Sequence, residues 1–326
     1  MFDPSRLFTC KLRDLGTVDA ALSSIYAPES DIGAKKIGIT KQFLERAEIY
    51  DRHYSQLNHF RKLVSDTLRF AGFEPVSDMS ILDIGSGSGN TVIPMMTMFE
   101  NARIVATDLS ENLLALLRRY AGDHDNLGIV CMDASKDYFV HGSFDLVIGG
   151  YILHHIIDPA DAIAASFRAL KPGGIAIWFE PFEAGHAVMR SVLEDAMADC
   201  EAGKEEAPAA LLEVFRRQVR DWKIRSDPNK SLQILHVLDD KHLFTRSYLD
   251  RIARKVGFEA TDIFAFSAGE RTFRNMMAGL IRLASLEQAA VPSWIWARID
   301  RWDTIPSPAL KSDLLFQGAI VMRKGP

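Results

Sequence analysis

Residues 80–89 read SILDIGSGSG, an apolar run that passes into an acidic, glycine-rich turn. The apolar residues 80–84 predict a buried β-strand, and a helix is expected to begin at about Asn90. Gly85, Gly87 and Gly89 allow a tight turn between the two and let backbone amides approach a ligand closely. The stretch therefore predicts a nucleotide-type binding loop at the end of a strand.

A second acidic residue, Asp108, ends the next apolar run, residues 102–107. It follows the glycines at about the distance where a carboxylate binds the ribose of a nucleotide-like ligand. A dinucleotide-binding fingerprint would place a glycine where this chain has Asn90, and Asp83 would put a negative charge beside a pyrophosphate. Both features count against a dinucleotide, and the charge of Asp83 instead favours a cationic ligand that carries an amino group or a sulfonium.

With these motifs the chain resembles the class I S-adenosylmethionine-dependent methyltransferases, whose first motif is an acidic residue followed by Gly-x-Gly-x-Gly, here Asp83 to Gly89. The resemblance implies that Asp108 binds the ribose hydroxyls of S-adenosylmethionine (SAM). It also implies that Asp133, in the sequence CMDA at residues 131–134, lies beside the adenine amino group. The expected cofactor is therefore SAM.

The resemblance implies further cofactor contacts, from the glycine loop, the strand ends and an N-terminal helix that carries two tyrosines. The full set is Asp83, Gly85, Ser86, Gly87, Gly89, Asp108, Leu109, Asp133, Ala134, Gly150, Tyr50 and Tyr54. Two alternatives stay open. Asp133 also suits a helix cap, and a tyrosine pair four residues apart on an amphipathic helix also suits simple packing.

The alternation of strands and helices predicts an α/β, doubly wound, Rossmann-like fold. Helix-length segments separate five apolar runs, near residues 80–84, 103–107, 127–131, 144–149 and 174–180. Residues 258–266 and 314–322 supply a sixth and a seventh strand. In the resembling family the seventh strand is antiparallel and lies between the fifth and the sixth, so a seven-stranded sheet of this topology is expected.

The sequence outside these strands predicts helical additions with apolar stripes at three- and four-residue spacing. The expected organisation is a helical N-terminal arm at 1–70, the SAM-binding core at 71–181, a helical lid insertion at 182–240, continued core at 241–266, a helical insertion at 267–312 and the final core strand at 313–326.

Three residues are candidates for a general base beside the transferred methyl group. His154 and His155 follow the fourth strand, and histidine titrates nearest to neutral pH. Glu180 ends the fifth strand at the same edge of the sheet. A structural or cofactor-side role is the alternative for the histidines, because a Leu-His-His-Ile sequence at this place accompanies different substrates in the resembling family.

The composition of the chain limits the classes of binding partner that are expected. The 326 residues carry a formal net charge of -5, which gives no general attraction to nucleic acid. Cys10, Cys131 and Cys200 are widely spaced, so neither a disulfide framework nor a metal site is expected. No signal peptide or membrane-length apolar run is recognised, which predicts a cytoplasmic protein that does not bind a membrane. The oligomeric state stays open, with a homodimer among the alternatives.

The predicted activity is methyl transfer from SAM to a small organic acceptor by in-line displacement, with a hydroxyl group as the first choice of nucleophile. N- and C-methylation and a SAM-binding protein without methyl transfer are the alternatives. After the fourth strand the chain reads GGYI at residues 149–152, without the Asn-Pro-Pro-Tyr or Asp-Pro-Pro-Tyr sequence of nucleic-acid amino methylases. A nucleic acid is therefore not the expected acceptor.

Overall fold

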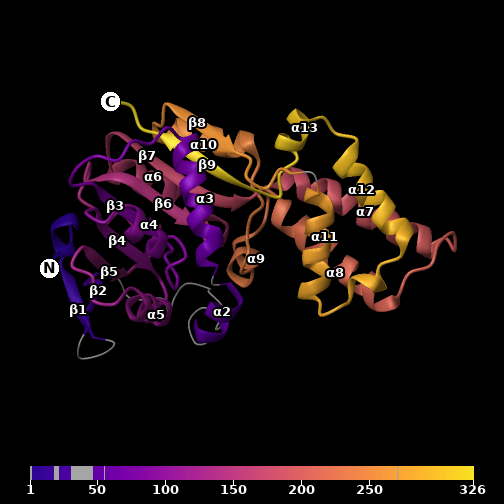
Figure 1. Ribbon diagram of the computed structural model, residues 1–326, viewed down its shortest axis with the longest axis horizontal. Coiled ribbons are helices and arrows are strands. Elements are labelled where there is room, and N and C mark those ends of the chain that lie inside the picture. Colours follow the sequence, from indigo (N-terminus) through magenta and orange to yellow (C-terminus); the bar gives the residue numbers. More distant parts are fainter. Residues whose placement is uncertain (1, 18–21, 31–46, 55, 270) are drawn as a thin grey trace.

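The structure is a computed structural model that describes residues 2–17, 22–30, 47–54, 56–269 and 271–326. At its centre is one mixed sheet with the strand order β1-β2-β5-β4-β3-β6-β7-β9-β8 (Figure 1). The strands are β1 Leu12–Gly16, β2 Ile25–Pro28, β3 Ser80–Ile84, β4 Arg103–Asp108, β5 Leu127–Cys131, β6 Phe144–Gly150, β7 Leu170–Pro181, β8 Ala260–Phe264 and β9 Gln317–Arg323.

Seven of these strands form the sheet that the sequence predicts. β3 pairs in parallel with β4 on one side and with β6 on the other, so the strand order reverses direction at β3. β9 lies between β7 and β8 and is antiparallel to both, which confirms the topology implied by the resemblance. Ligands of such sheets bind beyond the carboxyl ends of the strands at the reversal point, which here is the end of β3.

The N-terminal region differs from the expected helical arm. It contains two short strands: β2 joins the edge of the sheet in parallel with β5, and β1 pairs with β2 in antiparallel. The helices described in this region are α2 (Ala47–Tyr54) and α3 (Leu57–Phe70), besides a 3-10 turn. Strands of four and five residues are too short to show a clear alternation of apolar and polar residues, so pairing with the sheet edge decides their structure.

Helices cover both faces of the sheet, and alternate strand residues face opposite cores. Ile81 belongs to one buried cluster and Leu82 to the other, as the two-residue period of a strand requires. Local signals set the helix ends: the Ser110 hydroxyl accepts from the Leu113 amide, and Gly257 ends its helix in the left-handed conformation. These helices are α4 Val92–Met98, α5 Glu111–Ala121, α6 Pro159–Ala169 and α10 Arg246–Val256, and short 3-10 turns occupy Pro4–Leu7 and Leu153–His155.

Most of the remaining helices form a separate helical body beside the sheet (Figure 1). It combines segments from 183–226 and 272–313 around its own core, in which Phe215, Trp222 and Met277 are buried. Its helices are α7 Glu183–Glu201, α8 Ala209–Ser226, α11 Thr272–Leu283, α12 Ser293–Thr304 and α13 Pro308–Asp313, with a 3-10 turn at Gln288–Ala290. The short α9 (Leu232–Val237) lies between this body and the sheet.

A search of the described residues finds no helix with the length and apolar character needed to cross a membrane.

Candidate functional site

A pocket lies at the carboxyl ends of the central strands, where the strand order reverses. Eight of the residues singled out in the sequence line it: Gly85, Gly87, Asp108, Leu109, Asp133, Ala134, Gly150 and His155. Sequence reasoning missed nine others, Thr107, Ser110, Leu113, Met132, Tyr151, Ile152, Ile156, Asp239 and Lys241. Asp239 and Lys241 come from the segment after α9, which no cofactor motif marks.

The glycine loop after β3 takes a conformation that a side chain would block. Gly85 has φ +71, and a Cβ there would lie 2.6 Å from Cγ1 of Ile152 across the pocket. Gly89 has φ +108, and its Cβ would lie 2.7 Å from Cδ1 of Leu117. Both positions therefore need glycine, for the left-handed backbone and for the close approach of neighbours.

Ser86 and Asp83 lie beneath the loop. The Ser86 hydroxyl donates to Oδ1 of Asp83 at 2.5 Å and accepts from the Thr107 amide at 3.0 Å, so it joins β3 to β4. Asp83 does not itself line the pocket: it is fully buried behind the loop, and burial raises its pKa to about 7. Its Oδ2 has no hydrogen-bond partner among the described residues. A buried acceptor of this kind suits a cationic donor such as the amino group of SAM.

Asp108 connects the loop to the end of β4. Its Oδ2 accepts from the Gly87 amide at 2.9 Å and its Oδ1 from the Ser110 amide at 2.7 Å. These bonds fix the carboxylate at the pocket wall, and each oxygen retains lone pairs for the hydroxyls of a ribose. The geometry therefore fits the role that the sequence assigned to Asp108.

Asp133 accepts hydrogen bonds within a local turn and lines the pocket as well. Its Oδ1 accepts from the amide of Ser135 at 2.9 Å and from the hydroxyl of the same serine at 2.7 Å. Asp133 and Ala134 both face the pocket at the end of β5. No helix begins in the described residues 132–143, so the helix-cap alternative is wrong, while the position in the pocket wall is compatible with the adenine side.

The loop after β6 begins with an unusual backbone conformation. Gly150 lines the pocket, and the next residue, Tyr151, has φ +58, which is uncommon for a bulky residue. The Tyr151 hydroxyl donates to Oε1 of Gln317 on β9 at 2.9 Å. Tyr50 and Tyr54 lie in α2, but their side chains are outside the part of the chain that the structure describes.

Glu180 anchors this loop and does not line the pocket. Its carboxylate is fully buried and accepts from the amides of Ile152 at 2.9 Å and Leu153 at 2.6 Å. It also accepts from the amide of His154 at 3.3 Å and lies 2.6 Å from Nδ1 of that histidine. A carboxylate with these partners is held by the backbone and removed from the pocket, so the geometry argues against the general-base role expected for Glu180.

His154 is held between two carboxylates. Its Nδ1 faces Glu180, and its Nε2 lies 3.5 Å from Oδ1 of Asp240. Burial lowers the pKa of His154, but the charges of Glu180 and Asp240 outweigh burial and raise it to about 9. The ring is therefore a cation at neutral pH, and a cation cannot accept a proton from an acceptor molecule.

His155 is the only one of the three base candidates that lines the pocket. Its Nδ1 lies 3.0 Å from the carbonyl oxygen of Asp239 and therefore donates to it. Burial, together with the charge of His154, lowers the pKa of His155 to about 3. The ring is neutral but is a very weak base, far from the pKa near 7 that suits a general base at neutral pH.

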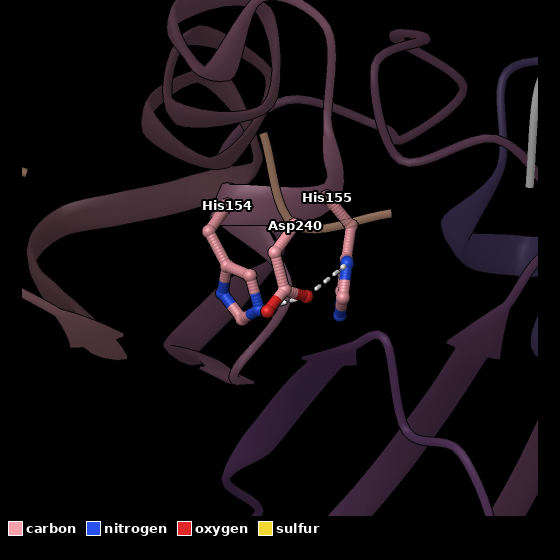
Figure 2. A group of neighbouring side chains, drawn as sticks. All are labelled: His154, His155 and Asp240. Atoms are coloured by element: carbon pink, nitrogen blue, oxygen red, sulfur yellow. Dashed lines mark ion pairs between the residues drawn. The ribbon is translucent and has the colours of Figure 1, made fainter. Parts of the chain in front are cut away.

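Figure 2 shows His154, His155 and Asp240 as one group, and their ligand-type atoms all lie within 4.8 Å of one another. Such a set can bind a metal ion only if both rings are neutral and turn a lone pair toward it. Here the His154 ring is charged, and the His155 nitrogen that faces Asp240 donates to a carbonyl. An ion-pair network accounts better for the arrangement than a metal site.

Comparison with known proteins agrees with the pocket geometry. Residues 82–178 match the family described as a methyltransferase domain. The demethylmenaquinone methyltransferase of Clavibacter sepedonicus is 28% identical over 145 residues, 44% of this chain and 58% of that protein. The ubiquinone/menaquinone biosynthesis C-methyltransferase UbiE of Desulfotalea psychrophila is 35% identical over 98 residues, 29% of this chain and 38% of that protein. The match thus covers less than two thirds of either relative.

A solved structure shows the same fold. Phosphoethanolamine N-methyltransferase 2 of Haemonchus contortus, in complex with phosphomonomethylethanolamine and S-adenosylhomocysteine, matches with a TM-score of 0.50 at 18% identity. The match covers 88% of this chain and 60% of that one. Together with the family match, this places a class I SAM-dependent methyltransferase domain in the chain, and SAM is the cofactor of that domain.

Proposed function

Because the chain carries a SAM-dependent methyltransferase domain, we propose that it methylates a small organic acceptor whose nucleophilic oxygen or carbon is already anionic near neutral pH. Acceptors of this class are carboxylic acids, acidic phenols and enols. The observation that carries the proposal is the state of the three residues expected to act as a base. Glu180 is buried under four hydrogen-bonding contacts, His154 is a cation, and His155 is a very weak base.

The reaction requires the protein mainly to hold the cofactor and the acceptor in the right positions. The cofactor, when bound, supplies a methyl group activated by its sulfonium. Asp108 and the glycine loop hold the ribose side, Asp83 attracts the amino group, and Asp133 lies at the adenine side. The β6 loop and Lys241 supply further parts of the pocket wall, against which the reacting groups can be positioned. A nucleophile that arrives ionised then needs no proton acceptor.

The names of the relatives support the same range of acceptors. They include C-methyltransferases of ubiquinone and menaquinone biosynthesis and the malonyl-[acyl-carrier protein] O-methyltransferase of Marinomonas, which is 26% identical over 149 residues. Quinone-type C-methylation and O-methylation of an acidic group are both compatible with a pocket without a strong base. An alkyl hydroxyl, which ionises only with the help of a base, fits less well than the sequence suggested.

The test measures S-adenosylhomocysteine formation from SAM with acceptors graded in acidity: a carboxylic acid, phenols of decreasing pKa, a reduced naphthoquinone and an alkyl alcohol. We expect turnover to follow acceptor acidity and kcat/KM to rise with pH through the pKa of each acceptor. His155→Asn should reduce kcat less than about tenfold, whereas loss of a general base typically costs about 100- to 10,000-fold.

The matched control is His141→Asn, because His141 is exposed and pairs with Asp137 outside the pocket. A kcat that falls more than about 100-fold in His155→Asn, with unchanged S-adenosylhomocysteine affinity, would show that His155 is a base after all. Turnover of the alkyl alcohol but not of the acidic acceptors would contradict the proposed acceptor class.

A further inference from the structure

Residues 238–242, here called the strap, connect α9 to the segment before α10 and form one wall of the cofactor pocket. Asp239 and Lys241 of the strap line the pocket together with Gly85 and Gly87 of the glycine loop and Asp108 at the end of β4. The strap belongs to none of the cofactor motifs recognised in the sequence. Its position nevertheless lets it cover a ligand held by Asp108 and the glycine loop.

Three hydrogen bonds tie the strap to the loop after β6. The Lys241 amide donates to the His154 carbonyl at 2.7 Å, and Nδ1 of His155 donates to the Asp239 carbonyl at 3.0 Å. Nε2 of His242 lies 3.0 Å from the Ile156 carbonyl. Strap and loop are therefore held together as two adjoining parts of the same wall.

Arg225, near the end of α8, ties the strap to the helical body. Its Nη1 lies 3.3 Å from Oδ2 of Asp240, and its Nη2 donates to the His242 carbonyl at 3.4 Å. Its own carbonyl accepts from the Leu243 amide at 3.3 Å. Arg225 is only 8% exposed, so its guanidinium is fixed by the surrounding helices.

The charges along this connection alternate in sign. Glu180 at the end of β7 faces His154, His154 faces Asp240, and Asp240 faces Arg225. The Asp240 side chain is 44% exposed, in contrast to the buried Glu180 and Arg225. The contact between Asp240 and Arg225 is therefore the one that water can reach. Its loss does not require the buried clusters of the sheet or of the helical body to open.

We propose that Arg225 and Asp240 are positioning residues that hold the strap closed over the cofactor and thereby slow its release. The inference rests on the proposed function only in that the pocket binds SAM and its product S-adenosylhomocysteine. It adds a role for the helical body, since α8 then helps to set the lifetime of the bound cofactor.

The experiment measures the dissociation rate of S-adenosylhomocysteine from the full chain by stopped-flow displacement. Arg225→Gln and Asp240→Asn should each raise this rate about fivefold or more, because each change removes the ionic contact that ties the strap to α8. The double variant should raise the rate by less than the two single effects combined, because the two changes share the contact between Arg225 and Asp240. Arg220→Gln, an exposed arginine on the same helix, is the matched control and should leave the rate unchanged.

Thermal unfolding of each variant separates positioning from general destabilisation. If Arg225→Gln does not fold, Arg225→Lys keeps the charge but not the fork of the guanidinium, and a smaller rise in the rate is expected. Unchanged dissociation rates in folded variants, or fully additive effects, would overturn the proposed role of the strap but not the proposed function. Failure of the unmodified chain to bind S-adenosylhomocysteine would overturn both this inference and the proposed function.

Discussion

Among single side chains, we propose that Asp108 orients the cofactor. Its carboxylate is fixed by the amides of Gly87 and Ser110 before any ligand arrives. A carboxylate in this geometry can accept two hydrogen bonds from neighbouring ribose hydroxyls, and such charge-assisted bonds are worth about 1.5–3 kcal/mol each. Binding of the cofactor therefore loses little further conformational entropy at this side chain.

We therefore expect Asp108→Ala to weaken S-adenosylhomocysteine binding by about 100-fold or more, measured by calorimetry. Asp108→Asn, which keeps the size but not the charge, should fall between the alanine variant and the unmodified chain. Asp137→Asn serves as the control, since Asp137 pairs with His141 outside the pocket. Equal affinity of Asp108→Ala and the unmodified chain would remove the ribose role from Asp108.

We expect Asp83 to make cofactor binding depend on pH. Burial raises the pKa of Asp83 from 3.8 to about 7 in the free protein. Folding therefore favours the protonated carboxyl group. Its contribution to the free energy of unfolding is complete below pH 3.8 and is lost as the pH rises through about 7. An ammonium group beside Asp83 favours the ionised carboxylate, so a cofactor must displace its proton below pH 7. We expect the affinity for S-adenosylhomocysteine to fall as the pH drops below 7, by up to about tenfold per pH unit.

Calorimetry at pH 5.5 to 8 checks this dependence, and Asp83→Asn should flatten it because the amide does not titrate in that range. A profile that is the same in both proteins would assign the pH dependence to another group.

The acids at the strand ends could be predicted from the sequence because each lies within a local motif. The opposite charge states of His154 and His155 could not. They depend on Glu180 and Asp240, which are distant in sequence and reach the two rings only through the fold. Adjacent identical residues thus acquire different chemistry from contacts that no local pattern shows.

At the level of elements, the loop after β6 depends on Glu180 for its shape. Three successive backbone amides and one imidazole converge on this carboxylate. The sequence correctly placed Glu180 at the end of a strand beside the site, but its position suggested a catalytic group. Its burial, which the sequence did not reveal, makes it a structural acceptor.

Glu180→Gln tests this assignment. The variant leaves the His154 cation without its buried partner, and breaking a buried ion pair typically costs about 3–5 kcal/mol of unfolding free energy. We expect a lower Tm and a lower midpoint of denaturation by urea. Glu183→Gln, a first-turn residue of α7, is the control. Unchanged stability with kcat reduced more than about 100-fold would instead indicate a general base.

The elements that were hardest to predict are those that depend on distant partners. The core strands and the antiparallel β9 follow from long apolar runs and from the resemblance. β1 and β2 are short and owe their structure to the edge of the sheet at β5, with Tyr26 paired to Val130. The strap shows no periodic pattern either, and its place in the pocket wall follows from the path of α8 and α9.

At the scale of the whole molecule, the sheet supplies the cofactor site and the helical body adjoins it through the strap. Two sequence segments, one on each side of β8, come together to build that body. Its apolar stripe on α8 was predictable from residue spacing, and Leu211, Phe215 and Trp222 are buried as expected. The position of the body beside the sheet was not predictable, because it depends on contacts among helices far apart in sequence.

The central claim is that the pocket at the carboxyl ends of β3, β4, β5 and β6 binds SAM. The most direct test is calorimetric titration of the unmodified chain with SAM, with NADH titrated in parallel. The account predicts binding of SAM in about the micromolar range and no measurable binding of NADH, because Asn90 replaces a fingerprint glycine and Asp83 repels a pyrophosphate. Absence of SAM binding, or preferential binding of NADH, would contradict it.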